Sequence, residues 1–219
     1  MNRQIPLDLR IPEALTRDDF LENEASGEAL ERVEQWPDWP HPDLVLIGGP
    51  GTGKTHLASI FAARSGAMYV DAASDLQPPR EIQASQTPIV IENVDRSIFD
   101  DAALFHLLNT AREAGRSVLL TLRSALTPTS KRLPDLVSRI NAIPAIGINP
   151  PNETFLRMLL VKLFADRQLA PDPVVIDYLV QRIERSPRAA GDVVDKLDRE
   201  ALASKRAVTR PMAAKVLGL

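Results

Sequence analysis

The residues best suited to chemistry lie in one short stretch, a glycine-rich loop followed by a lysine and a threonine. Residues 44–55 read LVLIGGPGTGKT, and their second half fits the pattern Gly-x-x-x-x-Gly-Lys-Ser/Thr. An apolar run precedes the loop and helical spacing follows it, which is the context that this phosphate-binding pattern requires. The glycines let backbone N–H groups curl around phosphate oxygens, and the start of the next helix adds its positive dipole end. The stretch therefore predicts a nucleotide site.

The lysine and the threonine of this loop have distinct expected parts. Lys54 can reach the β- and γ-phosphates, and the Thr55 hydroxyl can ligate Mg²⁺. The alternative is a glycine-rich turn with an exposed lysine. The loop residues expected to contact ATP or ADP are Gly48, Gly49, Pro50, Gly51, Thr52, Gly53, Lys54, Thr55 and His56.

An acidic residue ends a second apolar run, in the sequence PIVIENVD. Glu92 stands where a carboxylate could hold Mg²⁺ through water, and with Thr55 it forms the candidate metal site. The next residue is Asn93, whose amide cannot accept a proton and so cannot act as a general base. We therefore expect weak intrinsic hydrolysis. The alternative is that Glu92 and the nearby Asp95 are merely polar residues ending a core strand.

Three further residues could read the state of a nucleotide. Arg139 ends a predicted helix in LPDLVSRI, and Arg188 begins another in SPRAAGDVV. An arginine at either place can sense γ-phosphate charge, within the chain or across an interface. Thr121 is the polar residue of the apolar run SVLLTL and could hydrogen-bond a phosphate or water. Taken alone, each arginine would be a solvated surface residue, and the threonine would reflect β-propensity.

The elements that must position these residues alternate in type along the chain. Helical spacing occupies residues 17–35, 54–66 and 102–115. Apolar runs separated by helical or loop segments predict an α/β fold, with a parallel sheet covered by helices on both faces. The expected strands are residues 44–48, 67–72, 88–92, 117–122 and 143–148.

The pattern changes after Pro150 and Pro151, where Asn152 can cap a helix. From there the sequence predicts a small all-α domain, with helices over residues 152–169, 173–184, 187–205 and 209–217. The expected organisation is an extended N-terminal peptide (1–12), an α/β nucleotide-binding domain (13–150) and a helical lid domain (151–219).

Composition narrows the classes of function. The chain has 219 residues, 44% of them hydrophobic, and a net charge of −3, so strong direct DNA binding is not favoured. It has no cysteine, which excludes disulfides, zinc fingers and thiol catalysis. No run approaches the roughly 18 apolar residues of a membrane span, and the N-terminus carries no apolar signal, so the expected compartment is the cytoplasm.

Taken together, these motifs resemble the AAA+ ATPases, and within them the branch of the replication initiator DnaA and its Hda-type regulators. The order of P-loop, acidic strand, polar strand residue, arginine before the fifth strand and helical lid carries the resemblance over nearly the whole chain. The resemblance implies that Glu92 is the Walker B acid, Thr121 lies near sensor I and Arg188 is sensor II. It also implies that Arg139 is an arginine finger offered to the ATP held by DnaA.

Two features favour the Hda-type regulators over DnaA. The chain stops after the lid, so we expect it to lack the DNA-binding domain of DnaA. The segment QIPLDL resembles the peptide by which such regulators bind the DNA polymerase sliding clamp; its residues are Gln4, Ile5, Pro6, Leu7, Asp8 and Leu9. Pro6 would pre-extend the backbone while Leu7 and Leu9 fill an apolar groove. The alternative is an N-terminal strand packed on its own domain.

The leading hypothesis is therefore a nucleotide-bound regulator that binds the sliding clamp and stimulates ATP hydrolysis by DnaA, preventing re-initiation. The runner-up is an ATP-driven AAA+ loader or motor, which would need robust turnover of its own. A third possibility, a nucleotide-binding adaptor that anchors proteins at a membrane, has no supporting basic amphipathic stretch. Whether the chain forms a homodimer is left open.

Overall fold

The computed structural model describes residues 15–22, 26–72, 86–96, 100–127 and 132–219. Their backbone forms two compact units, residues 15–149 and residues 150–219. We call the first the α/β unit and the second the lid.

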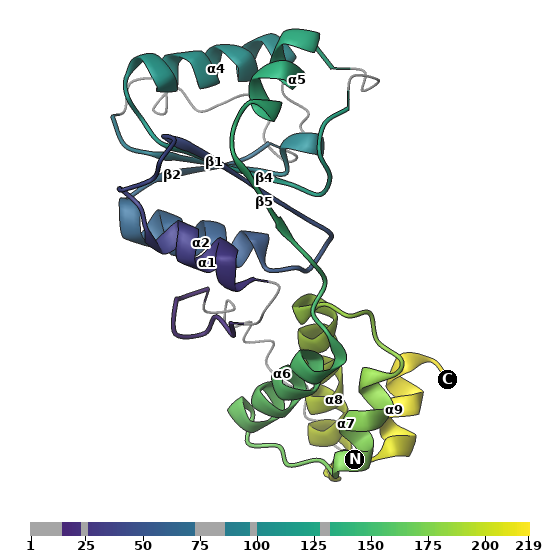
Figure 1. The fold of residues 1–219 in the computed structure, drawn as a ribbon. Coiled ribbons are helices and arrows are strands. Elements are labelled where there is room, and N and C mark those ends of the chain that lie inside the picture. Colours follow the sequence, from purple (N-terminus) through teal and green to yellow (C-terminus); the bar gives the residue numbers. More distant parts are fainter. Residues whose placement is uncertain (1–14, 23–25, 73–85, 97–99, 128–131) are drawn as a thin grey trace. The chain divides into compact units, whose positions relative to one another are not determined.

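A parallel sheet forms the centre of the α/β unit (Figure 1). Its five strands have the order β2-β3-β4-β1-β5, and every neighbouring pair is parallel. The strands β1, β3 and β4 are almost entirely buried, as their uninterrupted apolar sequences predict. The α/β fold class is thereby confirmed. The strand bounds are β1 (Asp43–Gly48), β2 (Met68–Asp71), β3 (Ile89–Glu92), β4 (Val118–Leu122) and β5 (Ala145–Ile148).

Helices cover both faces of this sheet. In Figure 1, α1 (Gly27–Glu34) and α2 (Lys54–Ser65) lie on one face, and α4 (Asp101–Glu113) and α5 (Pro134–Asn141) lie on the other. Successive strand residues point to opposite faces, so each strand contributes to both cores. On β1, for example, Leu44 and Leu46 join the core that contains α1 and α2, whereas Val45 joins the core that contains α4 and α5.

The prediction of helical structure over residues 17–35 is wrong for its first part. Residues 15–22 form turns and irregular backbone, and the helix begins only at Gly27. The helical spacing rests on Leu30 and Val33, both of which are buried within α1. Phe20, in contrast, packs against the start of α2, and this contact with a distant segment keeps its backbone out of a helix.

An aromatic cluster packs beside α2. Trp39 stacks on Phe61 with ring centroids 5.0 Å apart and an interplanar angle of 16°, and Trp36 meets the same ring edge-on at 5.9 Å. The Trp36 indole donates a hydrogen bond to Ser117 (3.2 Å), and the Trp39 indole donates one to the carbonyl of Arg32 (2.5 Å). The cluster therefore holds the segment after α1 against α2 and the start of β4.

The lid consists of helices in the predicted places, α6 (Glu153–Asp166), α7 (Pro173–Val180), α8 (Pro187–Ser204) and α9 (Arg210–Leu217). Side chains cap the first three: Asn152, Asp172 and Ser186 accept hydrogen bonds from first-turn amides. Such caps satisfy amides that have no partner within the helix. The local sequence thus sets each of these helix starts.

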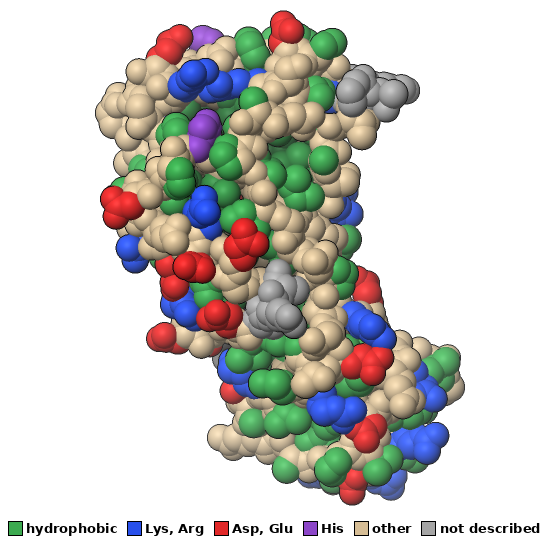
Figure 2. All heavy atoms as spheres, viewed as in Figure 1, with side chains coloured by type: hydrophobic (Ala, Val, Ile, Leu, Met, Phe, Trp, Pro, Cys, Tyr) green, Lys and Arg blue, Asp and Glu red, His purple; other side chains and the backbone are tan. Residues whose placement is uncertain are grey.

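The surface mixes charged and apolar side chains. On the face drawn in Figure 2, acidic and basic groups are interspersed with hydrophobic ones. Within the part of the chain that the structure describes, no helix combines the length and the apolar character needed to span a membrane.

Candidate nucleotide site

The glycine-rich loop joins β1 to α2, and its backbone explains why glycines are needed. Gly51 and Gly53 have φ values of 69° and 96°, in the left-handed region that other residues rarely adopt. A Cβ atom on Gly48 would lie 2.6 Å from the carbonyl oxygen of Ile148 and 2.7 Å from the Thr52 hydroxyl. The loop is therefore a close backbone cradle at the amino end of α2, which suits a phosphate group.

Lys54 folds back into this cradle. Its Nζ atom donates hydrogen bonds to the carbonyl oxygens of Gly48 (2.7 Å) and Gly49 (2.8 Å), and only 8% of the residue is exposed. Burial lowers the pKa of Lys54, and the positive charge of Arg123 lowers it further, while Glu92 acts in the opposite direction. The structure thus holds the lysine ammonium inside the loop where phosphate binding is predicted.

The two predicted metal ligands lie together. Thr55 donates its hydroxyl hydrogen bond to Oε1 of Glu92 at 2.9 Å, and Glu92 ends β3 almost fully buried. The described residues contain no group of three or more His, Cys, Asp or Glu side chains that could hold a metal ion. A hydroxyl and one carboxylate nevertheless fit Mg²⁺, which takes few protein ligands and completes its shell with water and phosphate oxygens.

Two more hydroxyl groups surround the same carboxylate. Thr121 on β4 is 1% exposed; its hydroxyl donates to Oε1 of Glu92 (3.4 Å) and accepts a hydrogen bond from the amide of Asn93 (3.0 Å). Tyr69 on β2 donates to Oε2 of Glu92 at 2.6 Å. Sequence reasoning missed Tyr69; the signal was a tyrosine two residues before Asp71, on the same face of a strand next to β3.

The residue after Glu92 is turned to a different partner. Asn93 has a φ of 56°, and its side-chain amide donates to Oδ1 of Asp71 at 2.8 Å. Nearby Asp95 accepts a hydrogen bond from the amide of Arg123 at 3.1 Å. The side chain at the position of a catalytic glutamate is therefore a hydrogen-bond donor fixed to the neighbouring strand.

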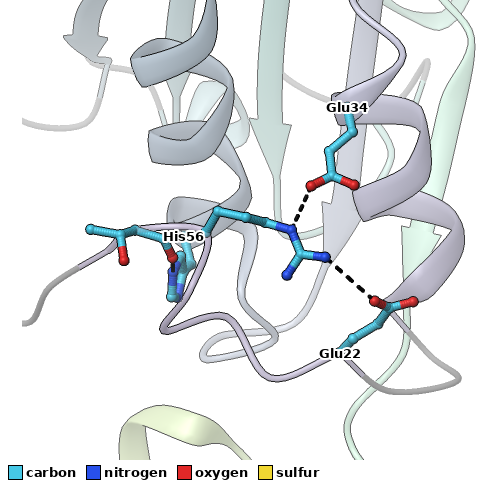
Figure 3. A network of polar contacts seen from close by, with 5 residues as sticks. Glu22, Glu34 and His56 are labelled. Carbon is cyan, nitrogen blue, oxygen red and sulfur yellow. Dashed lines mark hydrogen bonds and ion pairs between the residues drawn. The ribbon is translucent and has the colours of Figure 1, made fainter.

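The segment before α1 packs on the first turn of α2 (Figure 3). His56 lies 2.6 Å, through Nε2, from the carbonyl oxygen of Thr16, and Arg17 pairs with Glu34 at 2.5 Å. Phe20 meets the His56 ring edge-on, with centroids 5.0 Å apart. The ring nitrogen of His56 thus contacts this segment, and its contact with a nucleotide stays a prediction.

Arg139 lies near the amino ends of the strands, whereas the P-loop lies at their carboxyl ends. All strands are parallel; the P-loop follows the carboxyl end of β1, whereas Arg139 is in the last turn of α5, which leads into the amino end of β5. The length of β1 places these ends roughly 16 Å apart. The Nε atom of Arg139 is buried and finds no hydrogen-bond partner among the residues that the structure describes.

A buried carboxylate lies within electrostatic reach of this arginine. Asp43 begins β1, is 4% exposed and accepts a hydrogen bond from the amide of Val118 at 3.2 Å. Burial raises the pKa of Asp43, while His41, the Val118 amide, Arg139 and Arg112 act to lower it. Asp43 is thus a negative group within electrostatic reach of Arg139.

The remaining predicted residues are less constrained. Arg188 lies in the first turn of α8, its side chain is 81% exposed, and its nearest acid is Asp192 at 3.9 Å. Its contact with a nucleotide stays a prediction. The candidate clamp-binding residues 4–9 lie outside the described residues.

Comparison with solved structures identifies the fold of the chain. Domain III of the replication initiation protein DnaA of Thermotoga maritima has the same fold, with a TM-score of 0.77 and 17% identity over 93% of this chain and 95% of that one. A replication initiator DnaA bound to AMPPCP and single-stranded DNA is similar over 88% of this chain and 68% of that one, with a TM-score of 0.68 and 18% identity. The α/β unit and the lid therefore have the AAA+ fold.

Sequence comparison shows which AAA+ proteins this chain is similar to. Residues 158–217 match the family model of the Hda lid domain. A Haemophilus influenzae protein described as uncharacterized is 24% identical over the full length of both chains. The DnaA of Lacticaseibacillus casei is 27% identical over 76% of this chain, and the alignment spans 42% of that protein. The lid thus matches the Hda lid domain model, and the chain as a whole is similar to AAA+ proteins of the DnaA branch.

Proposed function

We propose that this protein is a nucleotide-bound regulator of replication initiation, which presents Arg139 to the ATP held by DnaA and so promotes its hydrolysis. Residues 4–9 would tether it to the DNA polymerase sliding clamp. The similarity of the lid to the Hda lid domain supports this assignment. So does the similarity of the α/β unit to DnaA, the expected partner.

The nucleotide in this proposal is ADP or ATP with Mg²⁺. The loop amides and Lys54 would hold the phosphates, and Thr55 and Glu92 would hold the metal ion. The metal would neutralise phosphate charge when bound. A structurally similar DnaA supports an adenine nucleotide, because that protein is bound to AMPPCP.

The observation that carries the proposal is the position of Arg139. It lies at the amino ends of the strands, away from the loop that would hold this chain's own nucleotide. This position supports an action of Arg139 on a nucleotide bound by another protein. An inserted arginine stabilises the charge that develops during phosphoryl transfer and raises hydrolysis by about 10³- to 10⁵-fold in P-loop systems.

The residues around the candidate nucleotide site support weak intrinsic ATP hydrolysis. Asn93 cannot take a proton from water, and its amide is bonded to Asp71. A loader or motor needs steady turnover of its own, so the asparagine disfavours that alternative. The same residue suits a protein that keeps its nucleotide and activates a partner.

The test follows ATP hydrolysis by DnaA with clamp loaded on DNA, with and without this protein. We expect clamp-dependent acceleration that Arg139→Ala abolishes while clamp binding is retained. Arg112→Ala is the matched control, because Arg112 is an exposed arginine that also acts on Asp43. Steady ATP turnover by this protein alone, without acceleration of DnaA, would instead identify a motor or loader.

A further inference from the structure

We propose that Tyr69 is a positioning residue for Mg²⁺-nucleotide binding: its hydroxyl fixes one oxygen of Glu92 so that the other faces Thr55. The inference rests on the proposed function, because it assumes that Thr55 and Glu92 hold the metal ion of a bound nucleotide. Neither the spacing of the motif nor the resemblance to AAA+ proteins assigns a role to Tyr69.

The geometry divides the two oxygens of the carboxylate between different partners. Oε2 accepts the hydrogen bond of Tyr69 at 2.6 Å. Oε1 accepts from Thr55 at 2.9 Å and from Thr121 at 3.4 Å. Because the tyrosine engages only Oε2, the oxygen next to the P-loop is the one directed toward the predicted metal position.

A glutamate needs such a partner more than an aspartate would. It has one more methylene group, and its terminal torsion is broad, so its carboxylate can take many orientations. Thr121 is held in β4 and buried, but it contacts the same oxygen as Thr55. Among the contacts of Glu92 that the structure describes, Tyr69 is the group that fixes Oε2.

The tyrosine is well suited to remain a donor. The phenol hydroxyl donates the hydrogen bond and Oε2 of Glu92 accepts it, because an ionised carboxylate can only accept.

The experiment measures the affinity of the whole chain for a fluorescent ADP analogue in Mg²⁺ and in EDTA, for wild type, Tyr69→Phe, Glu92→Gln and the double variant. Changing a residue that orients a metal ligand typically weakens metal affinity by about 10- to 100-fold. We expect Tyr69→Phe to lower the ratio of Mg²⁺ to EDTA affinity by about tenfold and to leave the EDTA affinity unchanged. The double variant should lose no more than Glu92→Gln alone.

Tyr178→Phe is the matched control, since Tyr178 is the only other tyrosine of the chain and lies in the lid. It should leave the ratio unchanged. A Tyr69→Phe protein with the wild-type ratio, or with equal losses in Mg²⁺ and EDTA, would overturn the positioning role while nucleotide binding stands. A wild-type chain that binds no ADP analogue in either condition would overturn the proposed nucleotide site and this inference with it.

Discussion

The side chain of Asn93 is fixed by its backbone as well as by its hydrogen bond. Its φ of 56° lies in the left-handed region, where asparagine is tolerated far better than most residues. Its amide donates to Asp71 across the β2–β3 pair. Both features have to change before a carboxylate at this position can face a water molecule.

We therefore predict that Asn93→Glu does not create a vigorous ATPase. The glutamate would adopt a left-handed conformation at a cost of about 1–2 kcal/mol and would bring a third carboxylate near Asp71 and Glu92. Steady-state ATP turnover should stay near background, and urea unfolding should show lower stability. Asn93→Gly is the control, because it keeps the backbone conformation. Rapid turnover by Asn93→Glu would contradict this account.

Asp43 gives a prediction about pH. Burial raises the pKa of Asp43 above the ordinary aspartate value of 3.8, so the folded state holds the proton more tightly than the unfolded chain. Its contribution to stability is therefore fully present below pH 3.8 and is lost as the pH rises through the raised pKa. The ionised carboxylate thus costs stability at neutral pH.

Asp43→Asn removes this cost and keeps a side-chain oxygen for the amide of Val118. We expect the variant to gain stability relative to wild type at pH 7 compared with pH 4, as measured by urea unfolding at both values. A variant that loses more stability at pH 7 than at pH 4 would show that pairing with Arg139 and its neighbours outweighs burial.

At the level of helices and strands, the local sequence pattern was sufficient to predict the strands of the sheet. The apolar runs predicted all five strands. Burial explains the uninterrupted apolar sequences of β1, β3 and β4, whereas the outer strands β2 and β5 are partly exposed. The loop and Glu92 could also be predicted, because their spacing and position follow from chain order. Tyr69 and Phe20 could not, because the contacts of each are with another segment and depend on sheet register and packing.

The helix starts in the lid make a paired prediction. Ser186 caps α8 by accepting a hydrogen bond from the amide of Ala189 at 3.1 Å, whereas Thr209 before α9 makes no side-chain cap. Ser186→Ala should lower the stability of the lid by about 1 kcal/mol, and Thr209→Ala should cost less. Urea unfolding followed by circular dichroism measures both. Equal losses of stability in the two variants would mean that the hydrogen bond accepted by Ser186 does not stabilise the start of α8.

Across the whole molecule, the parallel sheet separates two kinds of chemistry. The P-loop and Glu92 lie at the carboxyl ends of the strands, and Asp43 and Arg139 lie at their amino ends. A group at one end can change without touching the other. Under the proposed function, the protein would keep its own nucleotide at one end of the sheet and offer Arg139 at the other.

This separation predicts independent effects of two substitutions. Lys54→Ala should weaken binding of an ADP analogue by at least about tenfold, because a charge-assisted contact with phosphate is lost. Arg139→Ala should leave that affinity within about twofold of wild type, because Arg139 is at the far end of the strands. Equilibrium fluorescence titration tests both. A comparable loss in Arg139→Ala would place the arginine at the chain's own nucleotide.

The aromatic cluster beside α2 has a consequence for spectroscopy. The chain has two tryptophans, and both lie in the α/β unit with Phe61 between their rings. Indole emission therefore reports on that unit alone, while the far-ultraviolet circular dichroism signal also includes the four lid helices. Denaturation curves that coincide for the two signals would mean that the lid and the α/β unit unfold as one cooperative body. Curves that separate would give each its own stability from a single unlabelled sample.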